Sequence, residues 1–259
     1  MRYWDKAWSL VQSCTVVSEG CQHCWQLALN KRFGGSSAPR FREDRLEIPL
    51  RRKKPTVWFV LSDLFHERVR TDEIMAALHV MKRTPQHTYL VLTKRPYEMW
   101  RIIRDYYSDE PLPNVWFGTT AENQYRLEER IGYLKSLPVA NKFLSLEPLL
   151  APVDLRRWIY SDYRSSMDGW HCPENDAINR RGQFAVIVGG ESGPGHRPIK
   201  PEWVRVIHEQ CEAAGIPWML KQWHKQTDRD LDGRTYDDMP WRETNGSMPI
   251  ITEKLKGKP

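Results

Sequence analysis

The sequence predicts an α/β fold in which parallel strands and helices alternate to form a partial or full β/α barrel. Short apolar runs recur along the chain and are nearly continuous, which indicates strands that are buried on both faces and paired in parallel. Helical patterns separate these runs, with about thirty residues in each strand–helix unit. A doubly wound open sheet is the main alternative.

Six strands are expected from apolar runs of four or five residues. These runs cover residues 57–61, 88–92, 115–118, 142–146, 185–188 and 217–220. A shorter apolar stretch, residues 10–12, is a further candidate for the first strand.

Four helices are expected between these strands, at residues 72–82, 96–104, 122–137 and 201–214. Thr71 precedes the first helix and is of the residue type that caps helix N-termini. The third helix carries Leu127 and Ile131 at core spacing. The fourth begins at Pro201 and is followed by Gly215, which are the residues favoured at helix starts and ends.

Two segments break this alternation. Residues 160–183 are polar and are expected to form an insertion or a lid. The chain after His224 is polar and poorly patterned. We therefore expect a barrel domain at residues 1–224 and a C-terminal extension at residues 225–259.

The size and the composition restrict the class of protein. A chain of 259 residues is long enough for one large α/β domain with its own core. It has no long apolar run, so we expect no membrane partner, and it opens with no secretory signal, so we expect a cytoplasmic location. Five cysteines in a reducing compartment are typical of metal-binding or catalytic sites. Cys172 and Cys211 stand apart from the others and are expected to be incidental.

Positive charge is concentrated in one stretch of the chain. The net charge is +6, and seven basic residues fall within fifteen positions, namely Arg40, Arg42, Arg45, Arg51, Arg52, Lys53 and Lys54. Such density favours a polyanionic partner, although a solvated surface loop is the alternative. The twelve tryptophans favour nucleic acid, because exposed aromatic faces stack on bases.

Polar clusters follow almost every expected strand. They comprise residues 62–67, 93–96, 119–123, 147–148, 189–193 and 221–224. In a β/α barrel the carboxyl ends of the strands surround the active site, so these clusters are expected to converge on one pocket.

Several members of these clusters are candidates for chemistry. Asp63 and His66 are candidate acid/base groups. Glu147 is either a ligand for an ammonium or ribose group, or an ion-pair partner of Lys94 or Lys221. In the cluster at residues 189–193, Gly189 and Gly190 would let a cofactor approach the backbone closely. The Glu191 carboxylate would receive an ammonium group or ribose hydroxyls.

Three cysteines, Cys14, Cys21 and Cys24, form one cluster near the start of the chain. Three thiolates can hold a cubane iron–sulfur cluster and leave its fourth iron open, whereas an electron-transfer cluster normally takes four protein ligands. Zinc with His23 or His66 as the fourth ligand is a second interpretation. A disulfide with one free thiol is a third, and it does not suit the expected compartment. The open-iron cluster agrees best with a barrel mouth.

These residues resemble the radical S-adenosylmethionine proteins and, more closely, a phage- and prophage-encoded family long catalogued without a firm function. The resemblance covers most of residues 1–224. It is carried by the three-cysteine loop at 14–24, Ser-Asp-Leu-Phe-His-Glu at 62–67, Pro-Gln-His-Thr at 85–88, Leu-Thr-Lys-Arg-Pro at 92–96, Glu-Pro-Leu-Leu at 147–150, Gly-Gly-Glu-Ser-Gly at 189–193 and Lys-Gln-Trp at 221–223.

The resemblance implies a reaction and a set of roles. A 4Fe-4S cluster on the three cysteines would bind S-adenosylmethionine at its open iron, and a 5′-deoxyadenosyl radical would abstract a hydrogen atom from the substrate. The implied cofactor-binding residues are Ser62, Thr119, Glu147, Gly189, Gly190 and Glu191. The implied catalytic residues are Asp63, His66, Lys94 and Lys221, and the implied substrate-binding residues are Arg95, Gln222 and His224.

The implied substrate is a modified pyrimidine base in phage DNA, which the enzyme would rearrange or isomerise after the base leaves the helical stack. RNA or a free small molecule is the alternative substrate. The expected partners are DNA and a reductant such as flavodoxin or ferredoxin, in the cytoplasm of a bacterial host. A non-enzymatic, zinc-stabilised nucleic-acid-binding module is the rival from another class.

Overall fold

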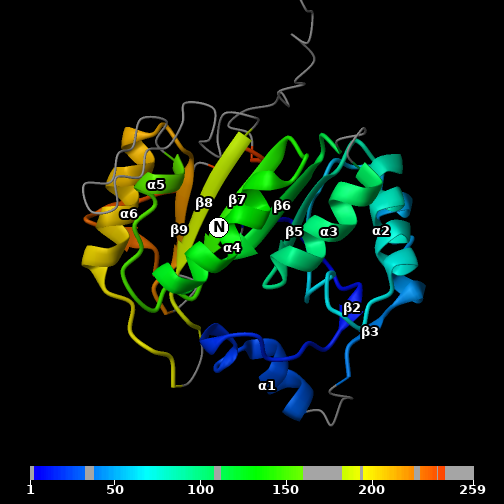
Figure 1. Cartoon of the computed structure of the whole chain (residues 1–259), viewed down its shortest axis with the longest axis horizontal. Coiled ribbons are helices and arrows are strands. Elements are labelled where there is room, and N and C mark those ends of the chain that lie inside the picture. Colours follow the sequence, from blue (N-terminus) through cyan, green and yellow to red (C-terminus); the bar gives the residue numbers. More distant parts are fainter. Residues whose placement is uncertain are drawn as a thin grey trace, which may run out of the picture.

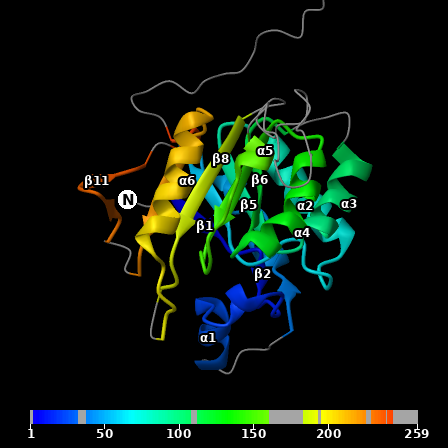
Figure 2. The ribbon, with the colours of Figure 1, turned by 60° about the vertical axis from the view of Figure 1, so that its left-hand side comes forward.

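A computed structural model describes residues 3–32, 38–107, 112–159, 183–192, 195–224, 228–237 and 239–242 of the chain. A curled sheet forms its centre, with the main helices packed on the convex face (Figures 1 and 2). The prediction of an α/β fold built on parallel strands is confirmed.

The central sheet has seven strands, all parallel. In spatial order they are β1 (Lys6–Trp8), β4 (Val57–Val60), β5 (Thr88–Thr93), β6 (Val115–Thr120), β7 (Asn141–Leu146), β8 (Gln183–Gly189) and β9 (Trp218–Gln222). This order follows the chain without a reversal, whereas a doubly wound sheet reverses its order at a switch point. The doubly wound alternative is therefore excluded, and the sheet is a partial barrel in which β1 and β9 are the edges.

The prediction for the first strand was wrong. The sheet begins with Lys6–Trp8, while Val11–Gln12 (β2) pairs antiparallel with Arg40–Phe41 (β3) in a separate two-stranded sheet. The first strand gives little apolar signal because two of its three residues are exposed. The segment that carries the three cysteines, residues 11–26 and hereafter the cysteine segment, nevertheless follows the first strand, as it would in a β/α barrel.

All four expected helices form. They are α2 (Thr71–Arg83), α3 (Pro96–Tyr107), α4 (Gln124–Ser136) and α6 (Pro201–Ala213). The expected cap of α2 was wrong by one residue. The N-cap is Arg70, whose N–H donates to Glu73 Oε2 at 2.8 Å, and Thr71 is the first helical residue. In α4, Asn123 is the cap and accepts from the Arg126 N–H at 2.9 Å, so the helix begins after Glu122.

The remaining elements are short. They comprise α1 (Trp25–Arg32), α5 (Arg156–Ile159), the 3-10 turns η1 (Glu19–Cys21), η2 (Glu43–Arg45) and η3 (Pro49–Arg51), and the hairpin of β10 (Asp230–Leu231) and β11 (Arg234–Thr235). The expected insertion, apart from residue 183, lies outside the described residues. None of the described helices is long and apolar enough to cross a membrane.

The two faces of the sheet bury different side chains, because side chains alternate along each strand. Val60, Val91 and Leu144 belong to the large core that the helices share with the convex face. A second core on the concave face contains Leu90, Trp116, Phe143, Ile187 and Met219.

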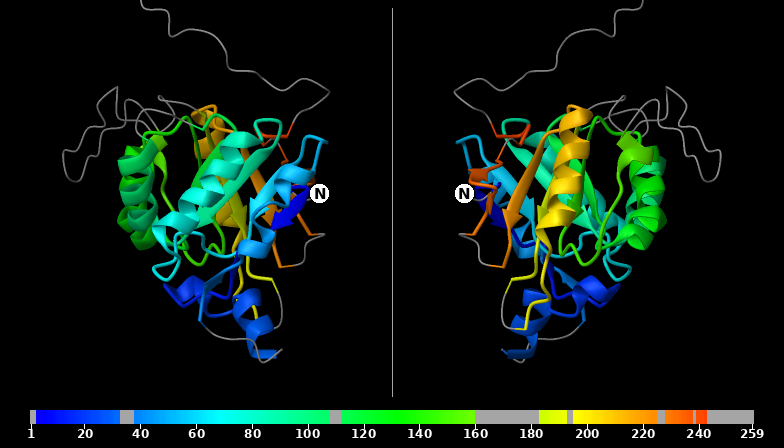
Figure 3. Two further views of the ribbon diagram at one scale, coloured as in Figure 1. Left: turned by 90° about the vertical axis from the view of Figure 1, so that its right-hand side faces the viewer. Right: turned by 90° about the vertical axis from the view of Figure 1, so that its left-hand side faces the viewer.

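Both ends of the described chain cover this concave core (Figure 3). The Trp241 ring lies 4.7 Å from that of Trp116 and 5.7 Å from that of Phe143. Its indole N–H donates to the Tyr3 carbonyl oxygen at 2.9 Å. Met239 and Trp241, at the end of the described part of the expected C-terminal extension, therefore pack against the inner face of the half-barrel.

Candidate functional site

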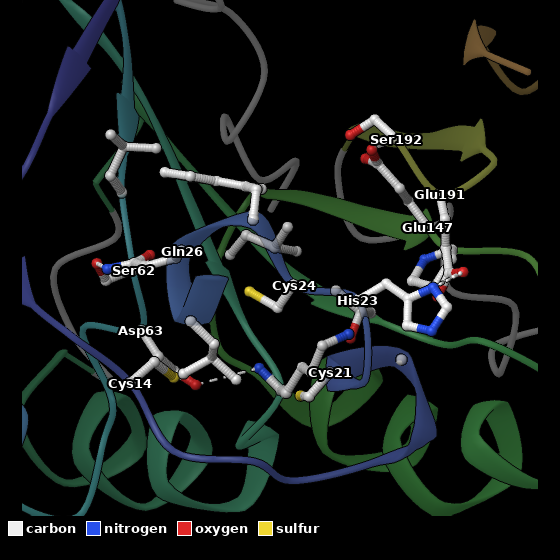
Figure 4. A pocket seen from close by; sticks show the side chains of 18 of the residues that line it. Cys14, Cys21, His23, Cys24, Gln26, Ser62, Asp63, Glu147, Glu191 and Ser192 are labelled. Carbon is white, nitrogen blue, oxygen red and sulfur yellow. Dashed lines mark hydrogen bonds and ion pairs between the residues drawn. The ribbon is translucent and has the colours of Figure 1, made fainter. Parts of the chain in front are cut away.

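A cavity of about 800 Å³ opens at the carboxyl ends of the strands. The cysteine segment and α1 lie across this edge of the sheet (Figures 1 and 2). The cavity is lined by Cys14, Cys21 and Cys24 together with residues that follow β4, β5, β7 and β8 and with the last two residues of β9. Figure 4 shows the cysteines beside Ser62, Asp63, Glu147 and Glu191. The expected convergence of the three cysteines and the strand ends at one place is thus present.

Local structure presents each cysteine differently. Ser13, which precedes Cys14, has a left-handed φ of +71°, and such a backbone costs a non-glycine residue on the order of 1 kcal/mol. Cys21 ends η1 and is buried, with the Val17 N–H 3.5 Å from its Sγ. Cys24 precedes α1, and its carbonyl oxygen accepts from the Ala28 N–H at 3.1 Å.

The three cysteines are not placed to bind a single metal ion. Among the residues that the structure describes, no group of three or more Cys, His, Asp or Glu side chains could hold one metal ion. Burial, and secondarily the charge of Asp63, raise the pKa of Cys14 to about 11, while Arg95 opposes this shift. Without a ligand, the Cys14 thiol is therefore protonated at neutral pH.

Arg95 fastens the cysteine segment next to Cys14. Its Nη2 donates to Thr15 Oγ1 at 2.7 Å, and its Nη1 lies 3.9 Å from Cys14 Sγ. The guanidinium also donates from Nη1 to Asp63 Oδ2 at 2.9 Å and from Nε to Glu67 Oε1 at 2.7 Å. A buried cation thus ties the strand ends to the loop.

His66 holds the same threonine from the other side. The Arg68 N–H donates to His66 Nδ1 at 3.1 Å, so the ring proton is on Nε2, which donates to Thr15 Oγ1 at 2.7 Å. Burial, and secondarily Arg95, lower the pKa of His66 below its usual value. His66 does not line the cavity, so it supports the loop from behind.

Asp63 lines the cavity but is already engaged. Besides its ion pair with Arg95, its Oδ1 accepts from Thr93 Oγ1 at 2.6 Å and from the Phe65 N–H at 3.1 Å. Its carboxylate is buried and holds the Arg95 guanidinium in place.

Glu122 forms a second anchor, which sequence analysis did not single out. This carboxylate is fully buried and accepts from Ser18 Oγ at 2.7 Å, from Lys94 Nζ at 2.6 Å and from Arg130 Nη1 at 3.1 Å. Burial raises the pKa of Glu122, but Lys94 and Arg130 outweigh it and hold the pKa below its usual value. A Cβ on Gly20 would overlap this carboxylate, so the loop packs directly on it.

Glu191 forms a third anchor, which contacts the cysteine segment at His23, between Cys21 and Cys24. Its Oε2 accepts from the Arg197 N–H at 2.8 Å and lies 3.1 Å from His23 Nδ1. Arg197 Nη2 in turn donates to the Glu19 carbonyl oxygen at 2.8 Å.

The fourth anchor is Ser62, which has a φ of +66°. Its Oγ donates to the Val11 carbonyl oxygen at 2.6 Å and accepts from Gln26 of α1.

One ion pair in the cavity has no bond to the cysteine segment. Lys221 Nζ donates to Glu147 Oε1 at 2.6 Å, which is one of the two partners that the sequence suggested for Glu147. The ammonium group also lies 5.6 Å from the centre of the Tyr3 ring. Both side chains line the cavity.

Three further sequence candidates do not line the cavity, namely Thr119, Gly189 and His224. Strand alternation turns Thr120 inward, and Thr119 Oγ1 donates to the Thr93 carbonyl oxygen at 3.0 Å. The His224 ring stacks on His196 at 4.7 Å.

Gly190 and Gln222 do line the cavity, but they bond to each other. The Gly190 N–H donates to the Gln222 carbonyl oxygen at 2.9 Å, and Gln222 Nε2 donates to the Gly190 carbonyl oxygen at 3.1 Å. A Cβ on Gly190 would overlap the Trp223 carbonyl oxygen. The glycine is therefore needed for the close approach of the ends of β8 and β9.

Comparison with known proteins identifies a family. The profile of the family described as "Protein of unknown function (DUF5131)" matches residues 1–244. The chain belongs to this family. No curated protein and no solved structure matches it.

Proposed function

We propose that this chain, as a member of the DUF5131 family, is a radical S-adenosylmethionine enzyme. The observation that carries the proposal is that Cys14, Cys21 and Cys24 line one cavity at the carboxyl edge of a singly wound parallel sheet. Enzymes with β/α barrels place their reactive groups at this edge. The resemblance of the cysteine loop and the strand-end motifs to radical S-adenosylmethionine proteins points to the same reaction class.

The donor set fits a cubane cluster with one open iron. Thiolates are the usual ligands of such clusters, and the described lining of the cavity contains three cysteines and no fourth. Three thiolates that share one tetrahedral ion lie about 3.8 Å apart, and the described residues offer no such group. Thiolates that each bind a different iron are not held to that spacing.

The zinc alternative receives less support from the histidines. Both ring nitrogens of His66 are hydrogen-bonded, one to Thr15 and one to Arg68. His23 Nδ1 faces Glu191. A zinc ion bound by His66 would therefore break an anchor of the loop, whereas His23 could bind one through Nε2 while Nδ1 stays on Glu191. The described residues nevertheless offer no group of three or more Cys, His, Asp or Glu side chains placed to hold one ion.

In this proposal the residues divide into two groups. Cys14, Cys21 and Cys24 hold the cluster, and the anchors built on Arg95, Glu122, Glu191 and Ser62 hold the loop. When bound, a reduced cluster and S-adenosylmethionine supply one-electron cleavage of a C–S bond and, from it, hydrogen-atom abstraction. Glu147 and Lys221 offer an anion and a cation to orient bound groups, and apolar side chains such as Leu61 and Leu92 limit water in the cavity.

We propose a nucleobase in DNA, an already modified pyrimidine, as the substrate that is rearranged or isomerised. Arg40, Lys53 and Lys54 are exposed and, within the described residues, have no acidic partner. Arg40 pairs with Gln12, two residues before Cys14, so the basic segment begins beside the cavity. A filter-binding assay tests this part: affinity for duplex DNA should fall steeply with salt, and a flat response would contradict a polyanionic substrate and leave a free small molecule.

The reaction class is tested by cofactor cleavage. Protein purified without oxygen and reduced with dithionite should convert S-adenosylmethionine to 5′-deoxyadenosine. The Cys21→Ala variant should lose this activity, and Cys211→Ala, which changes a buried core cysteine of α6, should keep it. Cleavage that survives in the Cys21 variant would refute the ligand assignment.

A further inference from the structure

We propose that Arg95 raises the reduction potential of the cluster by presenting a fixed cationic N–H donor to the sulfur of Cys14. The inference rests on the proposed function, because it concerns the group that the cysteine segment would hold. Arg95 Nη1 lies 3.9 Å from Cys14 Sγ, and only 6% of the Arg95 side chain is exposed. The donor is thus close to the sulfur and shielded from water.

The guanidinium cannot easily turn away from the thiol. Each of its nitrogens has another partner: Nε donates to Glu67 at 2.7 Å, Nη1 to Asp63 at 2.9 Å and Nη2 to Thr15 at 2.7 Å. The planar fork of arginine makes these bonds in one orientation. Because Thr15 follows Cys14 directly, the same contacts fix both the donor and its acceptor.

This contact distinguishes Cys14 from the other two cysteines. Within the described residues, no charged side chain bonds to the sulfur of Cys21 or Cys24. Hydrogen bonds to cysteine sulfurs and the local charge are the means by which a protein sets the potential of an iron–sulfur cluster. Reduction adds negative charge, so a cationic donor stabilises the reduced state and raises the potential.

The neighbouring carboxylates oppose this effect to different degrees. The buried Asp63 carboxylate acts against Arg95 at Cys14, whereas the side chain of Glu67 is 59% exposed, so its charge is screened by solvent. Arg95 is the cation that donates to this sulfur, and its contribution is best measured where Asp63 carries no charge.

The test compares variants that differ in Arg95 but keep the buried charges balanced. Arg95→Gln alone would leave Asp63 buried without a counter-ion. We would therefore compare Asp63→Asn with Asp63→Asn/Arg95→Gln, each reconstituted without oxygen, and measure iron content and the midpoint potential of the cluster. The double variant should have the lower potential, by about a tenfold change in the reduction equilibrium, which is about 59 mV for one electron.

A purely structural role predicts a different result. Iron content would fall in the double variant, while the potential of the remaining cluster would equal that of Asp63→Asn, and this would overturn the inference. If too little cluster remains to titrate, Arg95→Lys decides, because it keeps the charge but loses the fork: a lowered potential supports the inference and an unchanged one overturns it. A wild-type chain that takes up no cluster would instead refute the proposed function itself.

Discussion

Individual strand-end side chains in this protein act mainly as anchors for the cysteine segment. Ser62, Arg95, Glu122 and Glu191 follow four different strands, and each bonds to a different part of residues 11–26. Sequence analysis identified three of the four as functional but assigned them to cofactor or substrate. The sequence contains no signal for this distinction, because an anchor and a ligand require the same polar atoms at the same edge of the sheet.

Glu122 was missed for a local reason. The expected helix at 122–137 included it as an ordinary helical residue, but the Asn123 cap starts the helix at Gln124. Glu122 is thereby left at the strand end, where it is buried against Lys94 and Arg130. The Asn123 side chain, a preferred N-cap, was the signal that could have placed it.

Replacing Glu122 by Gln should destabilise the fold by about 3 kcal/mol, because the buried Arg130 and the half-buried Lys94 lose their counter-ion. Urea unfolding followed by circular dichroism measures this. Glu128→Gln is the matched control, since Glu128 lies on the exposed face of α4, and it should change stability by less than about 0.5 kcal/mol. Equal stability of the two variants would contradict the buried anchor.

Lys221 and Glu191 should respond differently to substitution, because only Glu191 holds the cysteine segment. Lys221→Met should keep the wild-type iron content but lower turnover at least about tenfold, the loss expected for about 1.4 kcal/mol of transition-state binding. Glu191→Gln should lose iron as well, since His23 and Arg197 lose their charged partner. Iron analysis beside product assays separates the two; loss of iron in both variants would argue against this division of roles.

The secondary-structure elements were predictable where their apolar pattern is strong. The six strands from β4 to β9 and the four long helices are buried and periodic, and their positions in the sequence agree with the structure to within a few residues. The first strand and α1 were not predictable, because β1 has one buried residue and the residues of α1 are mostly exposed. Alternation along β6 places Thr120 rather than the candidate Thr119 in the lining of the cavity, and the last inward-facing position cannot be fixed from an uninterrupted apolar run.

The junction of β8 and β9 should tolerate a methyl group at Gly189 but not at Gly190. A Cβ on Gly189 would lie 3.5 Å from Glu147 Cδ, an ordinary contact, whereas one on Gly190 would overlap the Trp223 backbone. Thermal unfolding should therefore give a clearly lower melting temperature for Gly190→Ala than for Gly189→Ala. Similar melting temperatures would show that the strand ends do not need this close approach.

The molecule as a whole is a half-barrel whose open inner face is covered by its own chain ends. Continuous apolar strands predicted the parallel sheet, and strand-end motifs predicted the side on which the site lies. The covering of the concave face was not predictable, because Tyr3, Met239 and Trp241 lie in polar surroundings in the sequence and are brought together only by the curled shape of the sheet.

Trp241→Ala should destabilise the protein by about 3 kcal/mol or more, as expected for loss of a buried tryptophan. The indole is 7% exposed and packs on Trp116 and Phe143. Trp25→Ala is the control, because Trp25 is 50% exposed and should affect stability little. Denaturant unfolding that places the two variants together would contradict a structural role for the C-terminal segment.

The central claim is that three cysteines at the rim of the half-barrel hold an iron–sulfur cluster. Counting metal and sulfide in protein purified and reconstituted without oxygen tests it most directly. The account predicts about four irons and four sulfides per chain, together with a brown colour that bleaches on reduction, and loss of both in the Cys21→Ala variant. A colourless protein that contains one zinc and no sulfide would contradict it.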